Sequence, residues 1–312
     1  MLDMRILIEL PSWLGDCVMA TPAIENIIDF YDNNVEITLL GNSISTEIMQ
    51  FHPRVVNSFI LSKNYKELYK TSKIIGDFDI FLSFRSSFRS TILKMLISSQ
   101  KKYQFNKKKF TIGHQVEKYN QFVQESLGVK KKPGKLKIFN IDTCYSSNER
   151  LLGINPGASY GSAKCWPHEK FVDVAIALSD KYKILIFGGS SEIELSKKIE
   201  KKLKDQNCKN FINLTGKTTI KELIEYISSL DLFITGDSGP MHIASAFQIP
   251  TISIFGPTKV FETCQWMNDK SVIVKKDLVC QPCMRRVCPL KHHNCMKKIS
   301  SNEVIDLALN LI

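Results

Sequence analysis

The 312-residue sequence lacks a long uncharged apolar run, so no segment has the length and composition of a membrane-spanning helix. Its first residues also lack the basic, apolar and small-residue order of a secretory signal peptide, because residues 5–10 already read as a buried strand. A cytoplasmic protein is therefore expected. Nine cysteines, an odd number without an export signal, favour free thiols or a metal site over a disulfide framework.

Several functional patterns are missing as well. The chain has no recognisable helix-turn-helix, RNA-recognition or zinc-finger pattern, and the glycine fingerprint of a dinucleotide site is absent after the first expected strand. These absences disfavour a nucleic-acid-binding protein and an NAD enzyme. Positive charge is abundant instead, with a formal net charge of +11. That excess favours an acidic partner, and an anionic membrane surface or a phosphorylated glycolipid fits it.

Apolar β-branched runs alternate with helical periodicity in two successive cycles. Strands are expected at residues 5–10, 35–40, 55–61 and 78–84, with a weak one at 136–139, and again at residues 151–155, 182–187, 211–214, 232–235 and 251–255. Such alternation is typical of parallel sheets with right-handed crossovers. The sequence therefore predicts two doubly wound α/β domains, residues 1–147 and 148–312, with a ligand cleft between their carboxyl edges.

Three loops in the second half have the composition of phosphate-binding loops. The turn after residues 232–235 offers the backbone N–H groups of Ser238 and Gly239 at a helix N-terminus, and His242 would face the same opening. A second loop, residues 157–164, combines small residues with the ammonium of Lys164, and residues 188–190 form the third. One such loop is common, but three that follow strands of one domain predict a phosphate site at a single sheet edge.

Three motifs carry a resemblance to a known family. They are Pro-Ser-Trp-Leu-Gly-Asp near the N-terminus, Pro-Gly-Ala-Ser-Tyr-Gly-Ser-Ala-Lys-Cys-Trp-Pro in the middle, and Gly-Asp-Ser-Gly-Pro-Met-His-Ile-Ala-Ser-Ala with Phe-Gly-Pro-Thr later. The sequence resembles the ADP-heptose:lipopolysaccharide heptosyltransferases of glycosyltransferase family 9, over nearly its whole length. The Trp-Leu-Gly-Asp form and a cysteine-rich segment most resemble the heptosyltransferase II group. The resemblance implies a GT-B architecture, two Rossmann-like domains with the acceptor on the first and ADP-heptose on the second.

The resemblance also implies roles for individual residues. Asp16 matches the proposed catalytic base, Lys164 the residue that meets the donor diphosphate, and Glu192 a ribose-binding carboxylate. The complete donor-side set is Ser159, Lys164, Gly188, Gly189, Glu192, Asp237, Ser238, Gly239 and His242. Ser238 stands where some family members have Thr, which keeps the hydroxyl.

The chemistry of sugar transfer fits these roles. An inverting transfer needs a base for the acceptor hydroxyl and positive groups for the departing diphosphate. Asp16 follows the first strand and could serve as that base, although an Asp at this place equally suits a helix N-cap. No Asp-x-Asp pair follows a predicted strand, so no metal cofactor is expected.

The cysteine-rich segment permits two interpretations. A structural zinc could be held by Cys280, Cys283, Cys288 and Cys295, with His292 and His293 nearby. The second half of the segment lacks a matching Cys-x-x-Cys, and reduced cysteines in a compact loop are therefore favoured. The neighbouring Arg285 and Arg286 either hold phosphate or are solvated.

The resemblance thus implies an inverting, metal-independent glycosyltransferase that moves heptose from ADP-heptose to the first heptose of the lipopolysaccharide inner core. The acceptor would be a heptosylated Kdo-lipid A, met at the cytoplasmic face of the inner membrane, and no nucleic acid is involved. Transfer of the first heptose or of another activated sugar is the alternative within the same class. A non-catalytic nucleotide-binding protein is the alternative from a different class. The last helix, residues 302–311, is expected to pack back on the first domain.

Overall fold

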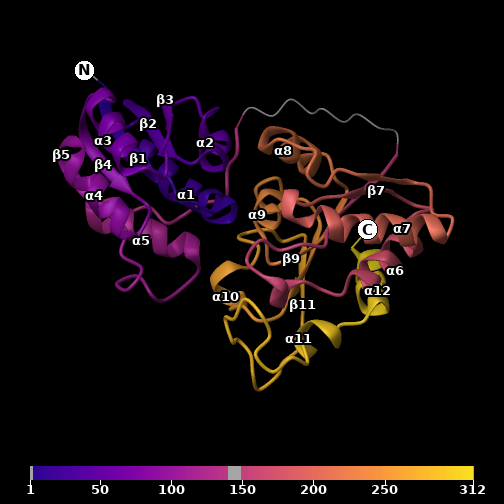
Figure 1. The fold of residues 1–312 in the computed structure, drawn as a ribbon. Coiled ribbons are helices and arrows are strands. Elements are labelled where there is room, and N and C mark those ends of the chain that lie inside the picture. Colours follow the sequence, from indigo (N-terminus) through magenta and orange to yellow (C-terminus); the bar gives the residue numbers. More distant parts are fainter. Residues whose placement is uncertain (1–2, 140–148, 312) are drawn as a thin grey trace. The chain divides into compact units, whose positions relative to one another are not determined.

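The structure, a computed structural model, describes residues 3–139 and 149–311. The chain divides into two compact units, Met1–Asn140 and Ile141–Ile312 (Figure 1). The polar stretch 145–148, where the sequence analysis places the domain boundary, lies outside the described residues.

The first unit is built on a five-stranded parallel sheet with the strand order β3-β2-β1-β4-β5. Its strands are β1 (Met4–Glu9), β2 (Val35–Gly41), β3 (Val55–Ile60), β4 (Asp77–Ser83) and β5 (Ser98–Gln104). Its helices are α1 (Leu14–Phe30), α2 (Ser43–Met49), α3 (Tyr65–Ile74), α4 (Phe88–Leu96) and α5 (Gln115–Leu127). The central strand β1 is apolar on both faces, because helices cover both sides of a sheet of this type.

The second unit repeats the plan with six parallel strands in the order β11-β10-β9-β6-β7-β8. Its strands are β6 (Leu151–Asn155), β7 (Lys183–Ile186), β8 (Phe211–Asn213), β9 (Leu232–Gly236), β10 (Thr251–Phe255) and β11 (Ser271–Lys275). Its α-helices are α6 (His168–Leu178), α7 (Ile193–Asp205), α8 (Ile220–Ser228), α9 (Gly239–Ala246), α10 (Val260–Thr263), α11 (Asn294–Lys297) and α12 (Ser301–Asn310). Two 3-10 turns, Ser162–Lys164 and Ser190–Glu192, follow β6 and β7.

Both sheets have the strand order of a Rossmann-type fold, and the predicted fold class is therefore confirmed. The order reverses between β1 and β4 in the first unit and between β6 and β9 in the second. At such a switch point the loops that leave neighbouring strands diverge to opposite faces, which opens a place for a ligand at the carboxyl edge.

Local sequence explains where several helices begin and end. Thr219 and Glu222 form a reciprocal capping box at the start of α8, with Thr219 Oγ1 accepting from the Glu222 N–H at 3.2 Å. Gly128 ends α5 with a φ of +80°, a left-handed conformation that glycine adopts without steric cost. In the second unit, Trp166 is buried in the core and donates its indole N–H to the main-chain oxygen of Ile299 at 3.1 Å.

Three expectations about strands differ from the structure. Residues 136–139 form no strand, whereas Ser98–Gln104, for which no strand was predicted, is edge strand β5. Edge strand β11 was also missed. The last helix, α12, packs on α6 and β10 of its own unit, with Val304 and Ala308 buried in that core. No helix among the described residues is long and apolar enough to cross a membrane.

Candidate active site

The switch point of the second sheet carries a buried ion pair. The Nζ of Lys164, which ends the 3-10 turn after β6, lies 2.6 Å from Oδ2 of Asp237, which follows β9. It also lies 3.2 Å from the main-chain oxygen of Asp237. Thr258, after β10, donates its hydroxyl to the same Oδ2 at 2.7 Å. The side chains of Lys164 and Asp237 are 13% and 6% exposed. Through its contacts with Lys164 and Thr258, Asp237 joins the loops after β6, β9 and β10 at this edge.

The start of α9 lies beside this pair. Ser238 is the N-cap residue, but its hydroxyl makes no capping bond and lies 2.9 Å from Thr235 Oγ1 and 3.3 Å from Asn155 Nδ2. Asn155 and Thr235 are register partners on β6 and β9. Because the Ser238 hydroxyl does not cap α9, the first backbone N–H groups of this helix, beginning with Gly239, can donate to another acceptor.

Glu192 joins the other two small-residue loops. Its Oε2 accepts the backbone N–H of Gly189 at 2.6 Å. A Cβ on Gly157 would lie 2.2 Å from Glu192 Cδ, and one on Gly188 would lie 3.0 Å from Glu192 Oε2. The carboxyl group is therefore packed against glycine backbone from both loops. Burial raises the pKa of Glu192, while the Gly189 hydrogen bond acts in the opposite direction.

Two predicted donor-side residues differ in exposure. Ser159 lies exposed in the loop after β6, and His242 is buried within α9. The structure thus connects Lys164 to Asp237, and Glu192 to the glycine loops.

Asp16 belongs to the first unit, at the carboxyl edge of its sheet. It lies in the first turn of α1, whose N-cap residue is Trp13, so the alternative interpretation of Asp16 as an N-cap is wrong. The side chain is partly exposed, and its charge lies near the buried hydroxyl of Tyr119 on α5. Burial, and next the negative charge of Asp16, raise the pKa of Tyr119 well above its usual value.

Sequence reasoning missed two residues around Lys164. Thr258 follows β10 and could have been found by the rule that polar residues at the carboxyl edge gather. Tyr160 gave no such indication. For Arg286, the sequence left open whether it holds phosphate or is solvated, and the structure places it beside Tyr160. Two cations lie over the Tyr160 ring: the Nζ of Lys164 is 4.7 Å from the ring centre, and the guanidinium carbon of Arg286 is 5.4 Å from the same ring centre. The Tyr160 hydroxyl donates to the main-chain oxygen of Met284 at 2.7 Å.

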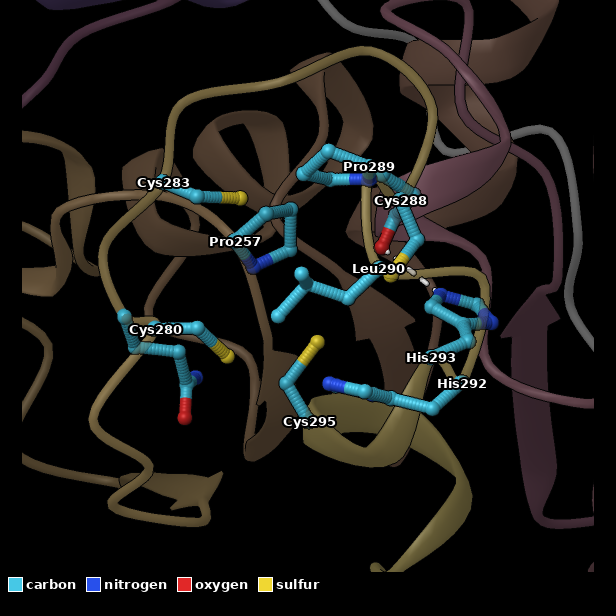
Figure 2. A pocket seen from close by; sticks show the side chains of 11 residues that line it. Pro257, Cys280, Cys283, Cys288, Pro289, Leu290, His292, His293 and Cys295 are labelled. Carbon is cyan, nitrogen blue, oxygen red and sulfur yellow. Dashed lines mark hydrogen bonds between the residues drawn. The ribbon is translucent and has the colours of Figure 1, made fainter.

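The cysteine-rich segment surrounds a small cavity of about 20 Å³ (Figure 2). The cavity is lined by side chains from the segment itself and from the loops after β6 and β10: Ala163, Pro257, Cys280, Gln281, Cys283, Cys288, Pro289, Leu290, His292, His293 and Cys295. The four cysteines are free thiols, and burial raises the pKa of Cys295. Within residues 3–139 and 149–311, no group of three or more His, Cys, Asp or Glu is arranged to hold a metal ion.

The same segment supports the candidate site. His293 Nε2 lies 2.9 Å from the main-chain oxygen of Ala163, next to Lys164. The N–H of Met284 donates to the Pro257 oxygen at 2.9 Å, next to Thr258. The cysteine-rich segment therefore packs on the two loops that carry the Lys164 and Thr258 contacts to Asp237.

Two doubly wound units, with phosphate-suited loops at the switch point of the second, have the two-domain architecture of the GT-B class. The family model of glycosyltransferase family 9 (heptosyltransferase) matches residues 74–294. Lipooligosaccharide heptosyltransferase 2 of Campylobacter jejuni is 42% identical over 320 residues, which cover 99% of this chain and 98% of that protein. The chain belongs to glycosyltransferase family 9, which confirms the family predicted from the sequence motifs.

Solved structures share the fold over the full length. The Escherichia coli ADP-heptose lipopolysaccharide heptosyltransferase II superposes with a TM-score of 0.81 at 20% identity, covering 99% of this chain and 98% of that one. The E. coli heptosyltransferase WaaC, solved with ADP, gives a TM-score of 0.79 at 15% identity, with coverage of 99% and 100%.

Proposed function

We propose that this enzyme transfers heptose from ADP-heptose to the first heptose of the inner core of a lipooligosaccharide, with inversion and without a metal cofactor. The near-full-length likeness to a protein named lipooligosaccharide heptosyltransferase 2 supports the reaction. The observation that carries the mechanism is the Lys164–Asp237 pair, since it holds an ammonium group at the switch point where a nucleotide diphosphate would lie.

The donor site is proposed in the second unit, Ile141–Ile312. The ammonium of Lys164 has three N–H donors and faces two oxygens of Asp237, which leaves one N–H for the diphosphate. Backbone N–H groups of Gly239 and its neighbours at the start of α9 would hold the other phosphate oxygens. Glu192 would bind the ribose hydroxyls, and the loops with Ser159, Gly188 and Gly189 would allow the nucleotide to approach the backbone closely. His242 completes the donor contacts.

The acceptor site is proposed in the first unit, Met1–Asn140. Asp16 would remove the proton from the acceptor hydroxyl as the new glycosidic bond forms. The Tyr119 hydroxyl lies near the Asp16 carboxylate and would help to orient it for the acceptor. As the bond to the donor breaks, negative charge develops on ADP, and Lys164 with the α9 N–H groups would stabilise it.

That arrangement supports metal independence, because a lysine and backbone donors would supply the positive potential that a divalent cation supplies elsewhere. We propose that Cys280, Cys283, Cys288 and Cys295 remain reduced thiols that shape the supporting segment, in preference to a structural zinc site. The net charge of +11 supports peripheral contact with the anionic cytoplasmic face of the inner membrane, where a Kdo-lipid A acceptor would be met.

Product mass spectrometry with ADP-heptose tests the proposal. We expect the wild-type enzyme to add one heptose to an acceptor that already carries one, and not to an acceptor that carries none. Asp16→Asn should lower the transfer rate about 100- to 10,000-fold and leave ADP affinity within about twofold, since general base catalysis contributes that much. Asp29→Asn, an exposed carboxylate on the same helix, is the matched control and should transfer normally.

Three other outcomes would contradict parts of the proposal. Addition to the heptose-free acceptor would indicate transfer of the first heptose. Binding of ADP without turnover on any acceptor would indicate a nucleotide-binding protein. Normal transfer by Asp16→Asn would refute the base assignment.

A further inference from the structure

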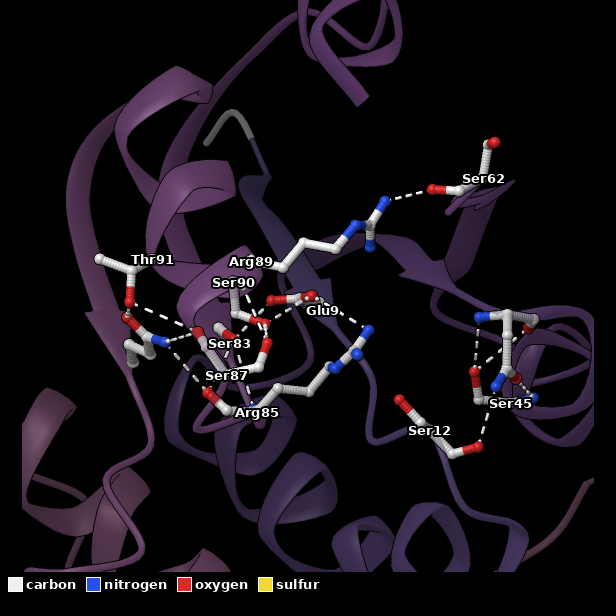
Figure 3. A network of polar contacts seen from close by, with 12 residues as sticks. Glu9, Ser12, Ser45, Ser62, Ser83, Arg85, Ser87, Arg89, Ser90 and Thr91 are labelled. Atoms are coloured by element: carbon white, nitrogen blue, oxygen red, sulfur yellow. Dashed lines mark hydrogen bonds and ion pairs between the residues drawn. The ribbon is translucent and has the colours of Figure 1, made fainter. Parts of the chain in front are cut away.

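A fully buried carboxylate lies at the switch point of the first sheet. Glu9 is the last residue of β1 and is 0% exposed, opposite its register partner Ser83 on β4. Its Oε2 accepts the Ser83 hydroxyl at 2.6 Å, and its Oε1 accepts the Ser90 hydroxyl at 2.9 Å. Arg85 adds an ion pair, with Nη1 3.4 Å from Oε1 (Figure 3). Burial raises the pKa of Glu9, and the two hydroxyls and nearby arginines act against that change.

A second arginine lies over the same carboxylate. Arg89, on the first turn of α4, lies near enough to Glu9 to lower its pKa through its positive charge. Its guanidinium donates to the main-chain oxygen of Ser62, in the segment after β3. In Figure 3 the Arg89 side chain extends past Glu9 toward Ser62, and Arg85 reaches Glu9 from the other side. One guanidinium group therefore pairs with the buried carboxylate, and a second lies near it and is held by the Ser62 oxygen.

Three observations show more positive charge and more donors than Glu9 requires. Ser83, Ser90 and Arg85 already satisfy its two oxygens, so a second arginine is not needed to bury it. The Nε of Arg89 is buried, yet it has no hydrogen-bond partner among the described residues. Arg85 contacts Glu9 through Nη1, and no other polar partner of its guanidinium occurs in the described part of the chain. A buried unpaired donor costs free energy unless a ligand uses it.

The position and the type of group point to an anion. The β1–β4 edge is the default ligand position of a doubly wound sheet. Guanidinium groups fixed by a buried counter-charge present parallel N–H donors that match phosphate and carboxylate oxygens. Asp16 follows the same strand β1 and lies in the first turn of α1, so an acceptor bound here would also lie at the edge that carries the proposed base.

We propose that Arg85 and Arg89, positioned by the buried Glu9, form a binding site for a phosphate or carboxylate group of the acceptor. The assignment to the acceptor rests on the proposed function, whereas anion binding itself does not. Glu9 is a positioning residue in this site, because it pairs with Arg85, lies near Arg89 and is not exposed to the ligand.

Acceptor kinetics test whether Arg85 and Arg89 bind the acceptor. Arg85→Ala and Arg89→Ala should each raise the acceptor KM about 10- to 100-fold, the size expected for a lost charge-assisted hydrogen bond, and leave the ADP-heptose KM within about twofold. Arg89→Lys keeps the charge but removes the Nε donor and should fall between the wild type and Arg89→Ala. Arg54→Lys, before β3 at the opposite edge of the sheet, is the control and should change neither constant.

Inorganic phosphate tests the site without any sugar transfer. In ¹H–¹⁵N spectra, the Nε–H signals of Arg85 and Arg89, assigned from the two variants, should shift saturably as phosphate is added, while that of Arg54 stays in place. A phosphate response with unchanged acceptor KM in both variants would overturn the acceptor assignment. No response and no change in KM would overturn the site altogether. A response in a wild-type enzyme that transfers no heptose would support the anion site and refute the proposed function.

Discussion

Replacing Lys164 with Met tests whether the buried pair holds the donor site together. Met is close to Lys in length and apolar bulk, so the change removes charge with little loss of packing. Asp237 then stays 6% exposed with the Thr258 hydroxyl as its remaining side-chain partner at 2.7 Å. Breaking a buried ion pair from one side lowers the free energy of unfolding by about 3–5 kcal/mol. Because Lys164 is partly exposed, we expect a loss of about 3 kcal/mol. For a unit of this size that corresponds to a fall in Tm of roughly 6–12 °C.

A double-mutant cycle separates the pair from its surroundings. Asp237→Asn removes the carboxylate that Lys164→Met leaves unpaired, so the double variant should recover most of the lost stability. We expect a coupling energy of at least about 2 kcal/mol between the two positions, from denaturant unfolding at neutral pH. A single-variant loss below about 0.5 kcal/mol, or strictly additive losses, would refute the view that Asp237 depends on Lys164.

The same variant reports on ligand binding. If one N–H of Lys164 meets the diphosphate, Lys164→Met should weaken ADP about 10- to 100-fold by calorimetry. The Asp237→Asn variant keeps the ammonium and should bind ADP far better than Lys164→Met does. Equal ADP affinity in both single variants would mean that Lys164 acts through loop structure alone.

Two further changes probe the supporting loops. Because burial raises the pKa of Glu192, its contribution to folding is fully present below the unfolded pKa near 4.5 and is lost as pH rises through the raised value. Glu192→Gln should therefore gain stability relative to wild type between pH 4 and pH 7, and a pH-independent difference in denaturant midpoints would contradict this. Gly161 has a φ of +150°, and a Cβ there would lie 2.4 Å from the Arg286 main-chain oxygen. Gly161→Ala should cost about 1–3 kcal/mol of folding stability and speed thiol labelling of the cysteine-rich segment. Gly134→Ala is the control, because an added Cβ there would meet no atom within 4 Å, and it should change neither the labelling rate nor the stability.

The sequence predicted the buried strands and two of the edge strands, β3 and β8, but missed the edge strands β5 and β11. β1, β6, β9 and β10 are apolar and buried on both faces, so composition alone marks them. β5 reads Ser-Ser-Gln-Lys-Lys-Tyr-Gln, because an edge strand pairs on one side and tolerates polar residues. Its existence follows from hydrogen bonds to β4, which no local pattern encodes.

In the candidate site too, contacts between distant parts of the chain could not be predicted from local sequence. Motifs identified Lys164 and Asp237 separately, yet they are 73 residues apart and their ion pair depends on the β6–β9 register. Glu9 was missed for a related reason. In the sequence it is one carboxylate at the end of an apolar strand, and its importance appears when β4 brings Ser83 beside it.

The switch points of the two sheets hold positive charge for an anionic ligand in two different ways. In the second unit, the charge of Lys164 is matched by Asp237, so the ammonium is fixed before the donor arrives and little reorganisation is needed when ADP becomes the leaving group. In the first unit, Glu9 balances one of two arginines, which leaves one positive charge for a group that carries its own negative charge throughout the reaction. The unbalanced arginine charge at the edge of the first sheet suits the phosphate or carboxylate groups of the proposed acceptor.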